Sequence, residues 1–142
     1  MPQSLSKIYL HLVFSTKNRE RTLLPEHRDD LYAYMGGILH GLGCPVIKIG
    51  GEADHVHLLF CQSRSKSVSD IVRELKSSAT VWYQQRVGGG FHWQQGYGVF
   101  SVSQSKVETV KRYIETQEEH HRRLTFQEEY LMFLKEYGIQ YD

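Results

Sequence analysis

The stretch Asp54-His55-Val56-His57-Leu58-Leu59-Phe60 carries the strongest structural signal in the chain, because two histidines lie two residues apart inside an apolar run. Side chains alternate across a β-strand, so a strand over residues 55–61 places His55 and His57 on one face. The apolar residues between and after them then fill the opposite face. Two neighbouring imidazoles with a carboxylate just before them can bind a divalent metal ion.

Alternation and helical periodicity divide the rest of the chain into short elements. Residues 5–16 alternate and predict a strand, and residues 45–50 predict another, joined by a turn at 50–54 to the histidine strand as a hairpin. Behind Pro25, apolar residues at helical spacing predict a helix over 25–41. Further along we expect a helix from Ser67 or Ser69 to Arg86, a strand over 98–103, a helix over 105–124 and a short helix over 126–137. This order predicts an α+β fold with an antiparallel sheet in a split β-α-β arrangement, ferredoxin-like or RRM-like, with flanking helices.

The composition fits one domain over residues 1–142. Of the 142 residues, 40% are hydrophobic and 23% are charged, which is ordinary for a globular protein. No apolar run approaches the roughly 20 residues that cross a bilayer, and the first residues lack a signal-peptide pattern, so we expect a cytoplasmic protein without a membrane partner. Cys44 and Cys61 match no zinc spacing and are expected to be reduced.

The formal net charge of +1 does not by itself indicate a nucleic-acid-binding protein. The distribution of charge is more informative. Basic residues cluster in the loop after the first strand and recur along the helix that follows the histidine strand, whereas acidic residues gather towards the C-terminus. A basic side with an acidic tail and an evenly mixed solvated surface are both compatible with this pattern.

A tyrosine and a glutamine lie one helical turn apart in the expected helix 105–124. Tyr113 and Gln117 share one face, and His121 follows one turn later. If this helix packs over the histidine strand, a metal held by His55, His57 and the amide oxygen of Gln117 lies close to the Tyr113 hydroxyl. Such a set leaves positions open for water and phosphate, which suits Mg²⁺ or Mn²⁺ acting as a Lewis acid rather than structural zinc.

Each of these residues also has a simpler interpretation. A His-x-His pair on a strand is often two polar residues on a half-exposed face, and a tyrosine and a glutamine one turn apart are common in helices. The pair His120-His121 is more typical of a solvated helix end than of two ligands. His11 is expected to be a packed polar residue.

Taken in order, these segments resemble a known family. The Asp54-to-Leu59 stretch is similar to the His-hydrophobic-His motif of the HUH endonucleases. The segment Tyr113-Ile114-Glu115-Thr116-Gln117 resembles the tyrosine helix of the IS200/IS605 single-tyrosine (Y1) HUH transposases. Residues 9–17 and 93–103 are similar to strand segments of the same family, so the resemblance covers nearly the whole chain.

The resemblance implies a DNA strand transferase that acts on single-stranded DNA with hairpin ends. It implies that His55, His57 and Gln117 bind Mg²⁺ or Mn²⁺. It further implies that Tyr113 attacks the scissile phosphate, giving a 5′-phosphotyrosine link and a free 3′-OH that can later rejoin strands.

The resemblance also implies a homodimer whose active sites are shared between subunits, with Ser103-Gln104-Ser105 as the expected hinge. DNA contacts are expected from basic side chains, with Trp82 or Tyr83 available for stacking. The basic residues concerned are Lys17, Arg19, Arg21 and Lys76.

Three alternatives stay open at this stage. The first is a domesticated, REP-associated nuclease that cuts repeated palindromes without mobilising itself. The second is a non-catalytic nucleic-acid-binding module, in which Tyr113 has no chemical role. The third is a metal-dependent hydrolase that uses water as its nucleophile and leaves no DNA attached to protein.

Overall fold

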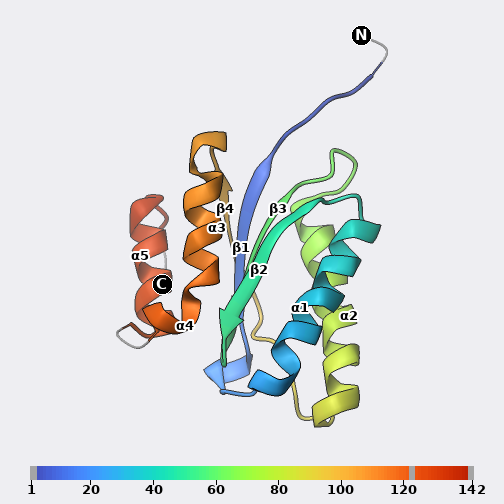
Figure 1. Ribbon diagram of the computed structural model, residues 1–142, viewed down its shortest axis with the longest axis vertical. Coiled ribbons are helices and arrows are strands. Elements are labelled where there is room, and N and C mark those ends of the chain that lie inside the picture. The colour runs from blue at the N-terminus through green and yellow to red at the C-terminus, as the bar shows by residue number, and fades with distance from the viewer. Residues whose placement is uncertain (1–2, 122–123, 141–142) are drawn as a thin grey trace.

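The computed structural model describes residues 3–121 and 124–140, which form one four-stranded antiparallel sheet with helices on both faces (Figure 1). The strands are β1 (Tyr9–Ser15), β2 (Val46–Glu52), β3 (His55–Cys61) and β4 (Gly98–Val102). The order across the sheet is β2-β3-β1-β4, so β1 pairs with both β3 and β4. With α1 (Pro25–Gly41) and α2 (Val68–Val87) as crossovers, the β-α-β-β-α-β order confirms the expected α+β, ferredoxin-like fold.

The two crossover helices cover one face of the sheet and the C-terminal helices cover the other (Figure 1). The C-terminal group comprises α3 (Val107–Glu115), α4 (Gln117–His120) and α5 (Phe126–Glu136), and short 3-10 turns lie at Lys17–Arg19 and Gln104–Lys106. The main core lies between the sheet and α1 and α2, and it contains Val56, Leu58 and Phe60. The alternation predicted for the histidine strand is therefore confirmed, because His55 and His57 face the C-terminal helices instead.

The hairpin between β2 and β3 is tighter than the expected turn over residues 50–54. Gly50 pairs with His57 and Gly51 with Val56, so both glycines lie inside β2. They are needed for close approach: a Cβ at Gly51 would overlap the His55 carbonyl oxygen, and one at Gly50 would lie 2.8 Å from that of Ile114 in α3. Gly50 and Gly51 are therefore required by the close approach of other backbone segments rather than by a turn.

The predicted helix over 105–124 is interrupted. Thr116 has φ −108° and ψ 25° and separates α3 from α4. Its hydroxyl donates to the carbonyl oxygens of Arg112 and Tyr113, at 3.1 Å and 3.3 Å, which competes with continuous helical geometry. The break turns α4 across the end of β2, beside which it packs. Among residues 3–121 and 124–140, no helix is long and apolar enough to cross a membrane.

Candidate active site

The two histidines of β3 are fully buried between the sheet and the C-terminal helices. His55 Nδ1 lies 2.8 Å from Asp54 Oδ1, and His57 Nδ1 lies 2.7 Å from Nε2 of His11 on β1. Each ring therefore uses its Nδ1 to fix its orientation and turns Nε2 towards α4 and α5. Ligating histidines are commonly oriented by such outer partners. His11 is a packed polar residue, as expected.

Burial keeps the imidazoles of His57 and His11 neutral. Loss of solvent lowers the pKa of His57 to about 4, although the nearby Glu129 carboxylate opposes the shift. Burial and the neighbouring His57 lower the pKa of His11 to about 3. A neutral imidazole offers a lone pair on one nitrogen, and this is the form that binds a metal ion.

Gln117 lies where a third ligand is expected. Its side chain is buried, and its Oε1 lies 2.8 Å from His55 Nε2. The amide Nε2 donates to Glu129 Oε2 at 3.2 Å, which leaves the amide oxygen aimed at the imidazoles. The close approach of α3 to Gly50 of β2 makes this contact possible, because α4 follows α3 directly in the chain.

Tyr113 projects from α3 into the same region. Its ring lies 5.8 Å from that of His57 and stacks on His120 at 4.5 Å. The phenol is half-buried and donates a hydrogen bond to Glu129 Oε2. Burial first, and then the Glu129 carboxylate, raise the pKa of Tyr113 above its usual range. The four site residues expected from the sequence thus lie in one region, and the tyrosine ring faces His57 of its own chain.

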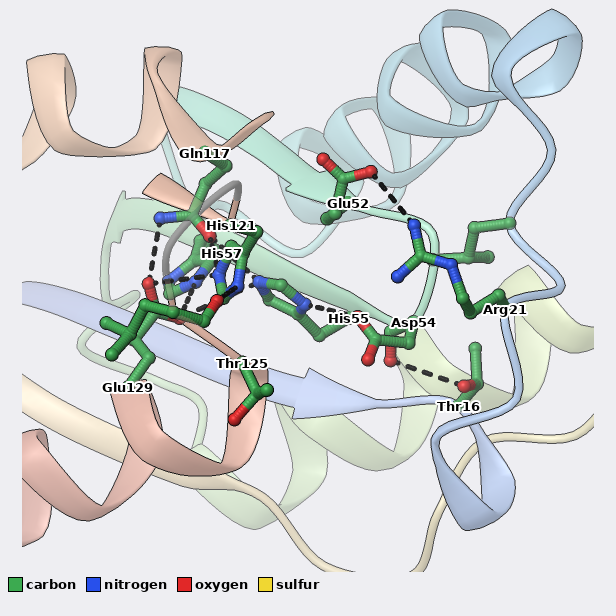
Figure 2. Close-up of polar contacts among 12 residues, drawn as sticks. Thr16, Arg21, Glu52, Asp54, His55, His57, Gln117, His121, Thr125 and Glu129 are labelled. Atoms are coloured by element: carbon green, nitrogen blue, oxygen red, sulfur yellow. Dashed lines mark hydrogen bonds and ion pairs between the residues drawn. The ribbon is translucent and has the colours of Figure 1, made fainter. Parts of the chain in front are cut away.

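Glu129 of α5 is a site residue that the sequence analysis missed. It is 1% exposed, and its Oε1 lies 2.9 Å from His57 Nε2 and 3.6 Å from His55 Nε2 (Figure 2). Burial alone would raise the pKa of this carboxyl, but hydrogen bonds from His121, His57 and Tyr113 outweigh it and lower the pKa. The sequence does hold a sign of this role, because Glu129 lies in an otherwise apolar helical stripe, where a carboxylate is unusual. The stripe consists of Phe126, Glu129, Tyr130 and Phe133.

The interpretation of His121 as part of a solvated helix end is wrong. This side chain is half-buried, with Nε2 lying 3.1 Å from Gln117 Oε1 and 3.3 Å from Glu129 Oε2 (Figure 2). Burial would lower its pKa, but the hydrogen bond and charge of Glu129 raise it. His121 follows Gln117 by four residues, and this spacing places both side chains on one face of a helix. Because α4 packs towards β3, that face points at the histidines.

The basic side chains expected to contact DNA lie in two places. Lys17, Arg19 and Arg21 are exposed around the loop that follows β1, beside the site, where Thr16 bonds the Asp54 carbonyl oxygen. The Lys76 ammonium is half-buried and donates to the carbonyl oxygens of Gln94 and Gly96, at 2.7 Å and 2.9 Å. Tyr83 is fully buried, which contradicts its suggested role in base stacking.

The donor set fits a divalent metal ion. Glu129 Oε1 lies within 3.6 Å of Nε2 of both His55 and His57, and the Gln117 amide oxygen contacts His55 Nε2, in the buried region between β3, α4 and α5. One ligand atom each from His55, His121 and Glu129 lie within 4.8 Å of one another. Imidazole together with oxygen ligands suits first-row divalent metals.

The chain is also similar to known proteins. A family model described as IS200-like transposase matches residues 4–117. The chain is 31% identical to the ISDra2 transposase TnpA of Deinococcus radiodurans, over 75% of this chain and 81% of that protein.

Two solved structures resemble the fold. One, of a protein described as a transposase of Deinococcus radiodurans R1, has a TM-score of 0.62 and 27% identity, covering 82% of this chain and 98% of that one. The other is a REP-associated tyrosine transposase bound to a REP hairpin. It has a TM-score of 0.64 and covers 85% of this chain and 73% of that one, but at 14% identity this is a likeness of fold alone.

Proposed function

The chain belongs to the IS200-like transposase family, and from that premise we propose that it cuts and rejoins single-stranded DNA through a tyrosine linked to a 5′ phosphate. The observation that carries the proposal is the position of the Tyr113 hydroxyl. It bonds the Glu129 carboxylate, which also contacts the two buried imidazoles and the Gln117 amide. A non-catalytic module has no need to bury these groups together.

The reaction exchanges one phosphodiester for another. The Tyr113 oxygen forms a bond to the scissile phosphorus while the bond to the 3′ oxygen breaks, and the proton lost by the phenol is balanced by the one that the 3′-OH gains. The covalent link stores the bond energy, so a 3′-OH can later attack it and release Tyr113 without a nucleotide cofactor. Hairpins beside the cut would mark the transposon ends.

The residues of the chain orient this exchange. The Glu129 carboxylate holds the Tyr113 hydroxyl in place, and Phe133 of α5 packs edge-on against the ring of this half-buried tyrosine. His55, His57 and Gln117 would hold Mg²⁺ or Mn²⁺, which as a Lewis acid polarises the phosphate when bound. Asp54 and His11 fix the two imidazoles at their outer nitrogens.

DNA would approach along the basic loop. Lys17, Arg19 and Arg21 are exposed, and Arg19 bonds Gln127 at the start of α5, so the loop flanks the site. We assign phosphate contacts to these three side chains. Two of the three ammonium protons of Lys76 already bond backbone carbonyl oxygens, which leaves one for DNA. Since cellular DNA is the substrate, we expect the protein to act in the cytoplasm.

The test uses a pool of single-stranded oligonucleotides with a hairpin stem and randomised flanks. Incubation with Mn²⁺ should give a protein–DNA adduct on a denaturing gel, and peptide mapping should locate the DNA on Tyr113. Tyr113→Phe and EDTA should each abolish the adduct, whereas the exposed Tyr97→Phe serves as a matched control and should not. DNA cleavage without an adduct would indicate attack by water, and an adduct that survives Tyr113→Phe would refute the assignment of the nucleophile.

We further propose that the protein acts as a homodimer whose active sites can be shared. The turn at Gln104–Lys106, just before α3, is the segment that would let the tyrosine helix exchange between subunits. Mixing Tyr113→Phe with His55→Ala protein tests this, because neither variant has a complete site. Activity restored in the mixture would support shared sites. No restoration, in a mixture shown to contain heterodimers by tagged co-purification, would mean that each chain uses its own tyrosine.

A further inference from the structure

The last helix lies outside the part of the chain that the family model matches, which ends at residue 117. α5 is nevertheless built into the site. Thr125 and Glu128 form a capping box that fixes its first turn, and Phe126 and Leu134 are buried against the sheet. At Gly98 of β4 a Cβ would lie 2.7 Å from the Tyr130 hydroxyl, so the sheet is shaped to receive the helix. The side chain that α5 delivers to the centre is Glu129.

Burying a carboxylate is unfavourable unless it is paired. Glu129 meets hydrogen-bonding groups on every side: His57 Nε2 at 2.9 Å, His121 Nε2 at 3.3 Å and Gln117 Nε2 at 3.2 Å. A divalent cation at the same point would be a favourable partner for this buried carboxylate.

The distances fit a shared ion. Ligand atoms of one metal, each roughly 2.0–2.2 Å from it, lie no more than about 4.4 Å apart. His55 Nε2 and the nearer Glu129 oxygen are 3.6 Å apart, and His121 Nε2 lies 3.3 Å from the other oxygen. Gln117 Oε1 contacts both imidazoles, at 2.8 Å from His55 Nε2 and 3.1 Å from His121 Nε2. Figure 2 shows these side chains pointing toward one another from β3, α4 and α5.

We propose that Glu129 and His121 are ligands of the same metal ion as His55, which adds an imidazole and a carboxylate to the set of His55, His57 and Gln117. This rests on the proposed function for the presence of a metal, and it goes beyond the ligand set that the family resemblance implies. A carboxylate adds negative charge and strengthens binding of a divalent cation. Imidazoles together with a carboxylate favour Mn²⁺ and its first-row neighbours over Mg²⁺, which prefers oxygen ligands and retains its water. The metal would also fasten α5 to the sheet.

Manganese binding without DNA tests the proposal independently of activity. Free Mn²⁺ is counted by electron paramagnetic resonance as the metal is titrated into the full-length protein. We expect Glu129→Gln, which preserves the shape of the side chain, to weaken Mn²⁺ binding at least tenfold. Glu136→Gln removes the same charge at the exposed end of the same helix and should change binding less than twofold. A large excess of Mg²⁺ should displace Mn²⁺ from the natural protein only weakly.

Two further variants separate the possible failures. His121→Asn lies outside α5, so it tests the ligand set even if Glu129→Gln disturbs the docking of that helix; it should also weaken binding at least tenfold. His55→Ala reports on the metal site of the proposed function itself. If His55→Ala loses Mn²⁺ while Glu129→Gln and His121→Asn bind it normally, the inference is overturned and the proposed function stands. If all variants bind like the natural protein, the metal in the proposed function is wrong as well.

Discussion

Gly50→Ala is expected to displace the nucleophile by acting on the packing of α3 against β2. A methyl group at this position would lie 2.8 Å from the carbonyl oxygen of Ile114 and 2.9 Å from its Cγ2, whereas ordinary contact begins at 3.4 Å. The helix must therefore withdraw by about 0.6 Å, carrying Tyr113 and Gln117 away from the histidines. Overpacking of this kind costs about 1–3 kcal/mol of folding stability.

Two measurements check the expected size of the effect. For a chain of this length, about 1–3 kcal/mol lowers the melting temperature by roughly 3–10 °C in calorimetry. A misplacement of about half an ångström should slow formation of the Tyr113–DNA adduct by roughly tenfold. Gly37→Ala is the matched control, because it makes the same substitution at an exposed position of α1 with no atom within 4 Å of the new Cβ. It should raise stability by up to about 1 kcal/mol and leave the adduct unchanged.

The proposed coupling between Gly50 and Tyr113 is refuted if Gly50→Ala melts like the natural protein and forms adduct at the natural rate. That result would mean that the contact between α3 and β2 yields without moving the site. Loss of stability without loss of adduct formation would show that the strain is absorbed elsewhere than at Tyr113.

Four further predictions concern stability and DNA binding. His11 and His57 have pKa values of about 3 and 4, so below pH 7 the unfolded chain takes up protons that the folded chain excludes. Urea unfolding of the metal-free protein should therefore show that the free energy of unfolding falls by about 2–4 kcal/mol between pH 7 and pH 5. The raised pKa of His121 acts in the opposite direction and offsets part of this loss. Tyr83→Phe removes a buried hydroxyl bonded at 2.8 Å to both Leu24 N–H and the Thr22 carbonyl, and thermal unfolding should show a loss of about 1–3 kcal/mol. Thr125→Ala breaks the capping box and should lower the free energy of unfolding by about 0.5–2 kcal/mol. The substitution should speed amide hydrogen exchange more in α5 than in the sheet. Lys17→Gln should reduce the salt dependence of single-stranded DNA binding by about 0.7 in log–log slope, as measured by fluorescence anisotropy; an unchanged slope would remove Lys17 from the interface.

The sheet and its helices were predictable because their signals are local. Strict alternation around His55 and His57 fixes which face each side chain takes, and Pro25 and Ser67 mark helix starts that the structure confirms. The bounds were less predictable. Gly50 and Gly51 indicated a turn, but they lie in β2 because another backbone approaches there, and this approach is a long-range contact.

The sequence by itself determined the two imidazoles on one strand face, the tyrosine and glutamine one turn apart, and the family that these motifs resemble. The strand face and the helix face follow from the side-chain periodicity of one strand and one helix, which residues close together in the sequence determine. Only the tertiary structure decided that Glu129 and His121 join them. Glu129 lies 72 residues along the chain from His57, and the docking of α5 that brings them together depends on packing between distant segments. No pattern of neighbouring residues predicts such a contact. The sequence hints at it only through one carboxylate, Glu129, in the otherwise apolar stripe of α5.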